Sequence, residues 1–169
     1  WEKPENKSKL AQKDIDADWT KKNGERHFGY KDHVKCDADS KLITNYSVTS
    51  ASVHDSQRCL VFIGQEDEVL YADSAYSGKP IALALPENCK NQICEKGYRN
   101  SPLTSEQKMN NRRKSRIRCR IEQIFGFMTG AMHGITIRSI GITRAWMNIG
   151  ITNLVYNFCR YSYLKRASA

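Results

Sequence analysis

The chain has 169 residues, a length typical of one domain that can bury a core. Its formal net charge of +9 is unevenly distributed: residues 1–95 sum to −3, residues 96–120 to +8 and residues 121–169 to +4. This distribution indicates that the second half of the chain binds an anionic polymer; the alternative is an ordinary solvated surface. The sequence has no run of about 18 apolar residues, which argues against a membrane-spanning helix.

Residues 1–13 are rich in Lys, Glu and Asn with a single Leu, and predict a linker or mobile arm. Residues 14–24 predict a polar loop that ends in an Asn-Gly turn. Apolar and polar residues alternate over 27–34, and again over 42–48 after a turn, so this part predicts two strands of an antiparallel hairpin.

The segment 54–63 has a helical pattern in which Leu60 and Ile63 are expected to pack inward. Residues 68–73 form a short apolar run that ends in Asp73, as a buried strand would. A strand, a crossover helix and a second strand make a βαβ unit, which predicts parallel pairing of 68–73 with the strand at 42–48. Ligands bind at the carboxyl ends of strands in open α/β sheets, so Asp73 is expected at a functional edge.

Further on, the sequence predicts a helix over 78–86, a short strand over 91–95 and a loop over 96–106. A last helix over about 140–164 is expected to be part of the core, with Trp146 as a large packing residue. Its inward face is predicted to carry Ile142, Trp146, Ile149, Asn153 and Tyr156.

Between these segments lies a long predicted helix, from residue 105 or 108 to residue 129, which Gly130 and Gly134 end. Its apolar residues recur at intervals of four, three and four, which places one buried stripe along the helix, formed by Ile117, Ile121, Ile124 and Met128. Glu122 lies beside this stripe, and Arg118 lies one turn before it. A solvated ion pair at the helix edge is the plain interpretation of these two residues.

Asp73 at a strand end and Glu122 on a later helix suggest a second interpretation. Phosphoryl transfer with divalent metals needs carboxylates that converge on two hard cations, and a nucleic-acid substrate needs cations beside them. The basic residues before Glu122 are therefore expected to contact DNA phosphates, which position the DNA without reading its sequence. An alternative role for Asp73 is that of a helix N-cap.

Five ordered blocks of the chain resemble the catalytic domain of DDE-type insertion-sequence transposases, which have a ribonuclease-H-like fold. The blocks are residues 16–22 (DADWTKK), 27–33 (HFGYKDH), 48–56 (VTSASVHDS), 71–76 (YADSAY) and 118–126 (RCRIEQIFG). The resemblance covers roughly residues 14–164. It implies an α/β fold, a mixed sheet flanked by helices, in which residues 14–169 are the carboxyl-terminal part of the catalytic domain.

The resemblance also implies site residues. Asp73 matches the second catalytic Asp of the family, Glu122 its catalytic Glu and Arg118 the Arg one turn before that Glu; Asp73 and Glu122 are the expected ligands of Mg²⁺ or Mn²⁺. The expected DNA-binding residues are Arg112, Arg113, Lys114, Arg116, Arg118 and Arg120. Departures from the family pattern occur at Asp18, Cys119 and Gln123, the last of which is expected to alter contacts beside the metal site.

In the family, the remaining catalytic Asp lies on a first strand upstream of the block that begins here near Asp14. Asp14, Asp16 and Asp18 match a loop block rather than this strand. The chain begins with Trp1 rather than Met, so we expect a truncated domain that lacks the first strand, binds metal weakly and performs no strand transfer.

The expected function is that of a DNA transposase that cleaves a strand at the ends of its element and joins it to target DNA. The open alternatives are a non-catalytic nucleic-acid-binding protein and a nuclease of the same fold. The expected partners are the DNA at the element ends and the target DNA; a homodimer is possible, and no membrane partner is expected. The expected location is the prokaryotic cytoplasm, in association with the nucleoid.

Overall fold

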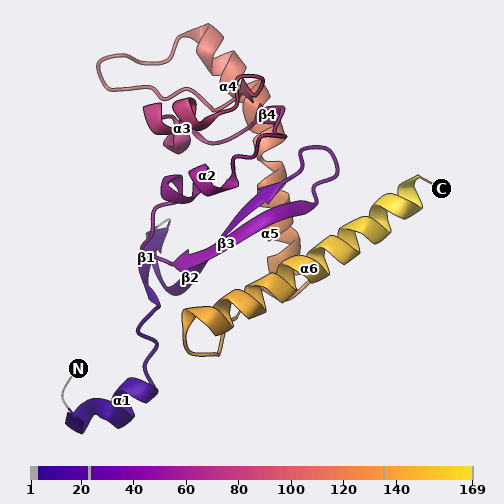
Figure 1. Ribbon diagram of the computed structural model, residues 1–169. Coiled ribbons are helices and arrows are strands. Elements are labelled where there is room, and N and C mark those ends of the chain that lie inside the picture. Colours follow the sequence, from indigo (N-terminus) through magenta and orange to yellow (C-terminus); the bar gives the residue numbers. More distant parts are fainter. Residues whose placement is uncertain (1–3, 23, 135, 169) are drawn as a thin grey trace.

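The computed structural model describes residues 4–22, 24–134 and 136–168, and its elements form two small sheets with helices around them (Figure 1). The first described elements are the 3₁₀ turn η1 (Pro4–Asn6) and the short helix α1 (Lys7–Ala11), which has no buried residue. Figure 1 shows α1 apart from the sheets and the other helices. The role of residues 1–13 as a linker stays a prediction.

The larger sheet contains three antiparallel strands, β1 (Asp18–Lys22), β2 (Glu25–Cys36) and β3 (Ile43–Ser50). The predicted hairpin is confirmed, because β2 pairs with β3 from Tyr30 opposite Ser50 to Cys36 opposite Ile43. The loop predicted over 14–24 is wrong in part, since residues 18–22 form β1 and pair with the first residues of β2. The turn between β1 and β2 contains Gly24 at φ +88°, a conformation that favours glycine.

The second sheet is a parallel pair formed by β4 (Val69–Leu70) and β5 (Lys90–Asn91). The ladder continues beyond these bounds, because the Gln92 amide donates to the Leu70 carbonyl (2.9 Å) and the Cys94 amide to the Ala72 carbonyl (3.1 Å). Both short strands are therefore confirmed.

The predicted parallel pairing of 42–48 with 68–73 is wrong. The strands β3 and β4 belong to separate sheets, and the parallel unit is instead β4, the helix α3 (Lys79–Ala84) and β5. The segment after β3, including helix α2 (Ser56–Phe62), carries the chain away from that sheet before β4 begins. An ion pair of 2.6 Å between Lys35 of β2 and Asp67, just before β4, links the two sheets.

Two apolar clusters hold these parts together. One lies between the larger sheet and the later helices and contains Ile43, Ile124, Met128 and Tyr156, while the other lies under the parallel pair and contains Cys59, Ile81 and Ile93. The expectation for Leu60 is wrong: its exposed fraction is 42%, because α2 turns the neighbouring Cys59 inward instead. Ile63 packs against the second cluster as predicted.

The predicted long helix is present as two helices, α4 (Ser105–Arg118) and α5 (Arg120–Gly130), with a break at Cys119. Thr104 and Gln107 form a capping box that begins α4. Of the predicted apolar stripe, Ile124 and Met128 are completely buried and Ile117 and Ile121 partly. The α5 helix ends at Gly130 as predicted, and Gly134 at φ +80° donates its amide to the Met128 carbonyl.

The last helix, α6 (Ile142–Ala167), packs on β3 and extends beyond the sheet at its carboxyl end (Figure 1). Ile149, Asn153 and Tyr156 are buried as predicted, but Trp146 is 47% exposed. In the turn that contains Trp146, the buried residue is Ala145 instead, and the Trp146 ring makes an edge contact with Tyr46. Within the described ranges, no helix is both long and apolar enough to cross a membrane.

Candidate functional site

Asp73 lies directly after the β4 ladder and begins the 3₁₀ turn η2 (Ser74–Tyr76). Its Oδ1 atom accepts a hydrogen bond of 2.6 Å from the Ser74 amide, so the N-cap role is present. The carboxylate is nevertheless exposed, and its Oδ2 atom accepts no hydrogen bond from the described residues. One oxygen of Asp73 is thus available to an external cation.

Glu122 lies in the first turn of α5, and its side chain is 61% exposed. The Arg118 guanidinium donates from Nη2 to Glu122 Oε1 at 2.8 Å, which confirms the predicted i,i+4 pair. The first turn of a helix also favours a carboxylate, because the unpaired amides there carry partial positive charge. The helix start thus favours a carboxylate at this position, and the hydrogen bond from Arg118 fixes one of its oxygens.

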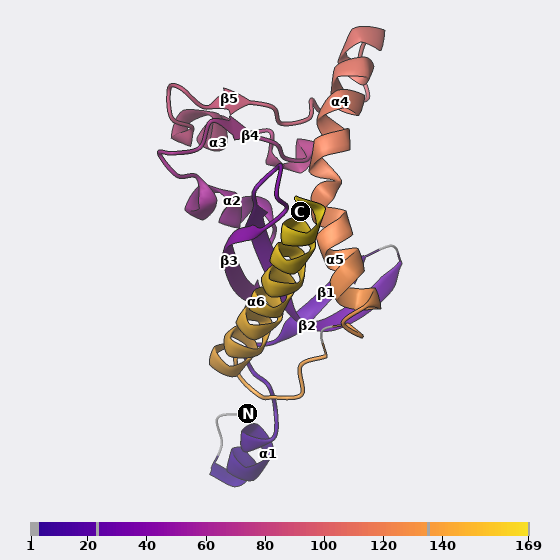
Figure 2. The same cartoon turned by 90° about the vertical axis from the view of Figure 1, so that its right-hand side faces the viewer.

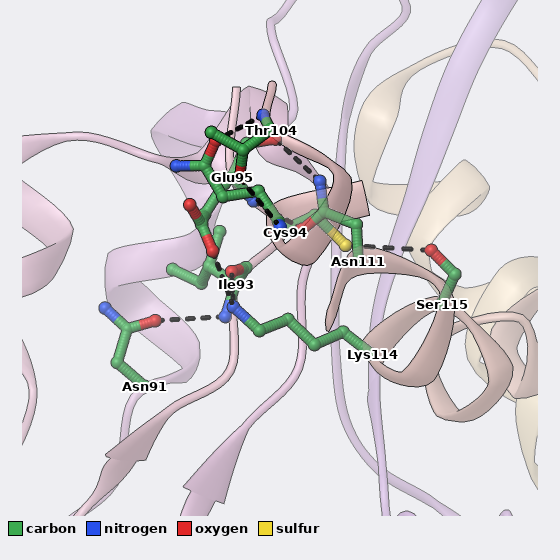
Figure 3. Close-up of polar contacts among 9 residues, drawn as sticks. Asn91, Ile93, Cys94, Glu95, Thr104, Asn111, Lys114 and Ser115 are labelled. Atoms are coloured by element: carbon green, nitrogen blue, oxygen red, sulfur yellow. Dashed lines mark hydrogen bonds and ion pairs between the residues drawn. The ribbon is translucent and has the colours of Figure 1, made fainter. Parts of the chain in front are cut away.

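Contacts between β5 and α4 bring the strand end of Asp73 close to the helix that leads to Glu122 (Figure 3). The Cys94 amide pairs with the Ala72 carbonyl, and the Cys94 Sγ atom lies 3.7 Å from Ser115 Oγ on α4. Ser115 and Arg118 are three residues apart and Glu122 follows four later, so the three share one side of the α4–α5 pair. No hydrogen bond or ion pair joins Asp73 to Glu122 in the described part of the chain.

Lys114 differs from the other predicted DNA-binding residues because its side chain forms contacts within the fold. Its Nζ atom donates to the Ile93 carbonyl at 2.9 Å and lies 3.9 Å from Glu95 Oε1, and its side chain is only 16% exposed (Figure 3). Asn111 adds two hydrogen bonds to the Glu95 backbone. Through these contacts, Lys114 attaches α4 to residues 93–95, which follow β5.

Arg112, Arg113 and Arg116 are exposed and form no ion pair among the described residues, whereas Arg118 pairs with Glu122 and Arg120 lies 3.5 Å from Asp39. A groove of about 890 Å³ runs along one side of α4. Its lining includes Lys108, Met109, Arg112, Arg116 and Cys119. A smaller hollow of about 440 Å³ separates α4 from the end of β4 and includes Tyr71 and Arg113. The cations therefore lie on more than one side of α4.

The described residues contain no group of three or more His, Cys, Asp or Glu side chains able to hold a metal ion. A further acid, Asp55, acts on the same group as Asp73. Burial, together with the charges of these two carboxylates, raises the pKa of Tyr76 to about 12. Asp55 in turn lies 3.4 Å from Lys31 Nζ and 3.6 Å from His33 Nδ1.

His33 is buried, and its Nε2 atom lies 2.8 Å from Thr49 Oγ1. Burial lowers the pKa of His33, against the opposing effect of Asp55. These contacts join two of the matched blocks behind Asp73, but Thr49 is only 2% exposed, so the cluster is structural. The alternation in β2, which turns Lys31 and His33 to one side, was the signal in the sequence that could have indicated this cluster.

Asp14 and Asp16 hold the beginning of α6. Asp14 accepts hydrogen bonds from the Tyr30 hydroxyl (2.7 and 2.8 Å) and from the Gly141 amide, and Asp16 Oδ2 accepts one of 3.0 Å from the Ile142 amide. Desolvation raises the pKa of Asp14, but these hydrogen bonds together lower it below its usual value. Their contacts are those of helix-capping residues.

Comparison with known proteins finds a family and relatives of the chain. The family model described as transposase DDE domain matches residues 3–158. The transposase for insertion sequence element IS1106 of Neisseria meningitidis serogroup B is 34% identical over 117 residues, which are 68% of this chain and 40% of that protein. The matched part thus spans less than half the length of this relative. No solved structure matches the chain.

Proposed function

The chain belongs to the transposase DDE domain family, and from this membership we propose that it forms part of a DNA transposase catalytic domain that cleaves and joins strands by metal-dependent phosphoryl transfer. The observation that carries this proposal is the position of the two matched carboxylates. Asp73 follows the parallel β4–β5 pair, and Glu122 lies on the helical segment that Cys94 and Ser115 attach to that pair.

The donor set suits a hard divalent cation such as Mg²⁺ or Mn²⁺, because both groups are exposed carboxylates with an oxygen that accepts nothing from the described residues. Asp73 and Glu122 would hold the metal, which would activate the attacking oxygen and stabilise the leaving oxygen. Two carboxylates are an incomplete set of ligands for this chemistry. We therefore expect weak metal binding and no strand transfer by the present chain alone.

Protein side chains supply the remaining parts of the proposed mechanism. Arg118 orients the Glu122 carboxylate through the 2.8 Å hydrogen bond, so one oxygen stays directed outward. Arg112, Arg113 and Arg116 neutralise DNA phosphates and set the register of the strand. Lys114 acts indirectly, by fixing α4 against β5.

The unpaired strand edges support a ribonuclease-H-like arrangement. Along residues 30–36, β2 pairs only with β3, and β4 pairs only with β5, so each has an edge without a strand partner in the described part of the chain. We place a further strand, which would carry the remaining catalytic Asp, between these edges. It would complete one mixed sheet across the gap that the Lys35–Asp67 ion pair now bridges.

The proposed partners are the DNA ends of an insertion element and the target DNA, with a homodimer as a further assembly state. A transposase of this kind would act on the nucleoid in a prokaryotic cytoplasm.

Cleavage and joining of a labelled element-end duplex in Mg²⁺ test this proposal. We expect no joining by the present chain and full activity in a protein extended to the length of its relatives. In that longer protein, Glu122→Gln should abolish both steps, whereas Glu106→Gln, an exposed acid of the same helical segment, should not. Activity that survives Glu122→Gln would refute the proposed site, and cleavage without joining would indicate a nuclease.

A further inference from the structure

Figure 2 shows the β1–β2 ribbon at the edge of the molecule, and two large aromatic side chains of this ribbon are exposed. Trp19 is 58% exposed and Phe28 is 51% exposed. The two residues are directly opposite each other in the ladder, and their ring centroids are 5.2 Å apart with planes inclined at 52°. Exposed aromatic area of this kind marks a binding surface more often than a single exposed apolar residue does.

The same face of the ribbon carries two cations. Lys21 is opposite Arg26 in the ladder, and alternate residues of a strand share a face, so both lie beside the aromatic pair. Both are exposed and form no ion pair among the described residues. The ribbon has two acids, Asp18 and Glu25, and both lie on the other face, where Glu25 is opposite Lys22.

The charge of the ribbon differs from that of its surroundings. Residues 1–95 have a net charge of −3, yet the ribbon (residues 18–22 and 25–29) carries three Lys and Arg residues against two acids, a net charge of +1. A cationic surface with exposed aromatic rings is the combination that binds nucleic-acid strands without sequence preference, because phosphates meet the cations and bases stack on the rings. Bases within a duplex are already stacked, so an exposed ring would take an unpaired base.

We propose that this aromatic–cationic face, formed by Trp19, Lys21, Arg26 and Phe28, binds an unpaired segment of a DNA strand. One base stacks on Trp19, and the flanking phosphates contact Lys21 and Arg26. The inference rests on the proposed function for its substrate class, DNA, and adds to it a site outside the carboxylates and outside α4. A transposase would use such a site to hold a strand end that is not base-paired.

Fluorescence anisotropy of two labelled probes tests the proposal: an oligothymidylate of roughly 12 nucleotides and a blunt duplex of the same length. Trp19→Ala should weaken binding of the single strand by roughly 5- to 150-fold, the loss expected for one stacked base, and change binding of the duplex less than about twofold. Trp19→Phe should recover part of the loss. Because Trp19 is exposed, these variants should keep the fold, which thermal unfolding followed by circular dichroism checks.

Lys22 provides a matched control, because it lies on the same strand with the same charge but on the opposite face. Lys21→Ala should reduce the salt dependence of single-strand binding by about 0.7 in the logarithmic slope, and Lys22→Ala should reduce it less. Equal effects of the two Lys variants would overturn the proposal, and so would a wild-type affinity of Trp19→Ala for the single strand. If the wild-type chain binds neither probe, the proposed function is overturned as well. If the wild-type chain binds the duplex, and Trp19→Ala binds the single strand as well as the wild type does, only the ribbon site is overturned.

Discussion

Asp32 is an acid of β2 whose removal should stabilise the protein at neutral pH. Its Oδ1 atom accepts a hydrogen bond of 3.3 Å from Asn153 of α6. Its Oδ2 atom and the Oδ1 atom of Asn153 are both buried and without a hydrogen-bond partner among the described residues. Burial raises the pKa of Asp32 to about 6, and the Asn153 hydrogen bond offsets only part of this effect. In Asp32→Asn, the new amide can donate to Asn153 Oδ1 and no charge remains to be buried.

The magnitude follows from the shift. A rise from 3.8 to about 6 corresponds to about 3 kcal/mol, at roughly 1.4 kcal/mol per pKa unit. Because the folded pKa of this acid is above its unfolded value, the folded state binds more protons between the two values. The cost of Asp32 is therefore absent below about pH 4, grows between about pH 4 and 6, and is constant above that range.

Urea unfolding of both proteins at pH 4 and pH 8 measures this effect. Asp32→Asn should be more stable than the wild type by up to about 3 kcal/mol at pH 8 and nearly equal to it at pH 4. Asp39→Asn is the control, since its side chain is fully exposed and the chemical change is the same. A variant that is less stable than the wild type at pH 8, or a difference that does not depend on pH, would refute the reasoning.

Three further changes test the packing around the proposed site. Gly150→Ala should cost about 1–3 kcal/mol of unfolding free energy, despite the better helix propensity of Ala, because the new methyl group meets the Tyr46 hydroxyl and the ring carbon that carries it; in a Tyr46→Leu background the cost should fall. Lys114→Ala should lower the unfolding free energy by about 1–2 kcal/mol and weaken binding of duplex DNA less than Arg113→Ala, which should change stability by less than about 0.5 kcal/mol. The pKa of Asp14 is lowered in the folded state, so Asp14→Asn should lower the unfolding free energy at pH 7, and that difference should shrink as the pH falls through the lowered pKa of Asp14; unfolding curves at pH 7 and pH 3 decide this.

Elements with one regular period were predictable from the sequence. The alternation over 27–34 predicts a strand that is present as part of β2, although burial along it does not alternate, since Phe28 is exposed and His33 is buried. The 3.6-residue period through Ile124 and Met128 reflects one buried face of α5. Strand β1 was missed because Asp18–Lys22 is exposed on both faces and carries no such contrast. Trp146 was misplaced because α6 has apolar residues on all sides, so periodicity could not choose the buried face.

The candidate site was predictable only in part. The pair of Arg118 and Glu122 follows from helical spacing, whereas the roles of Asp73 and Glu122 came from resemblance to a family. That Lys114 binds the Ile93 carbonyl could not be foreseen, since charge alone does not distinguish a phosphate ligand from a lysine that fixes a backbone oxygen. The separation of the sheets also depends on tertiary contacts that no local pattern records.

The central claim, that Asp73 and Glu122 hold one metal site, is tested most directly by Mn²⁺ titration of the chain followed by electron paramagnetic resonance. We expect weak binding that Asp73→Asn and Glu122→Gln each reduce at least about tenfold, and a double variant that loses little more than either single one, because the two changes act on the same site. Glu106→Gln should bind Mn²⁺ as the wild type does. Mn²⁺ affinity that both single variants retain, or losses that add fully in the double variant, would contradict the account.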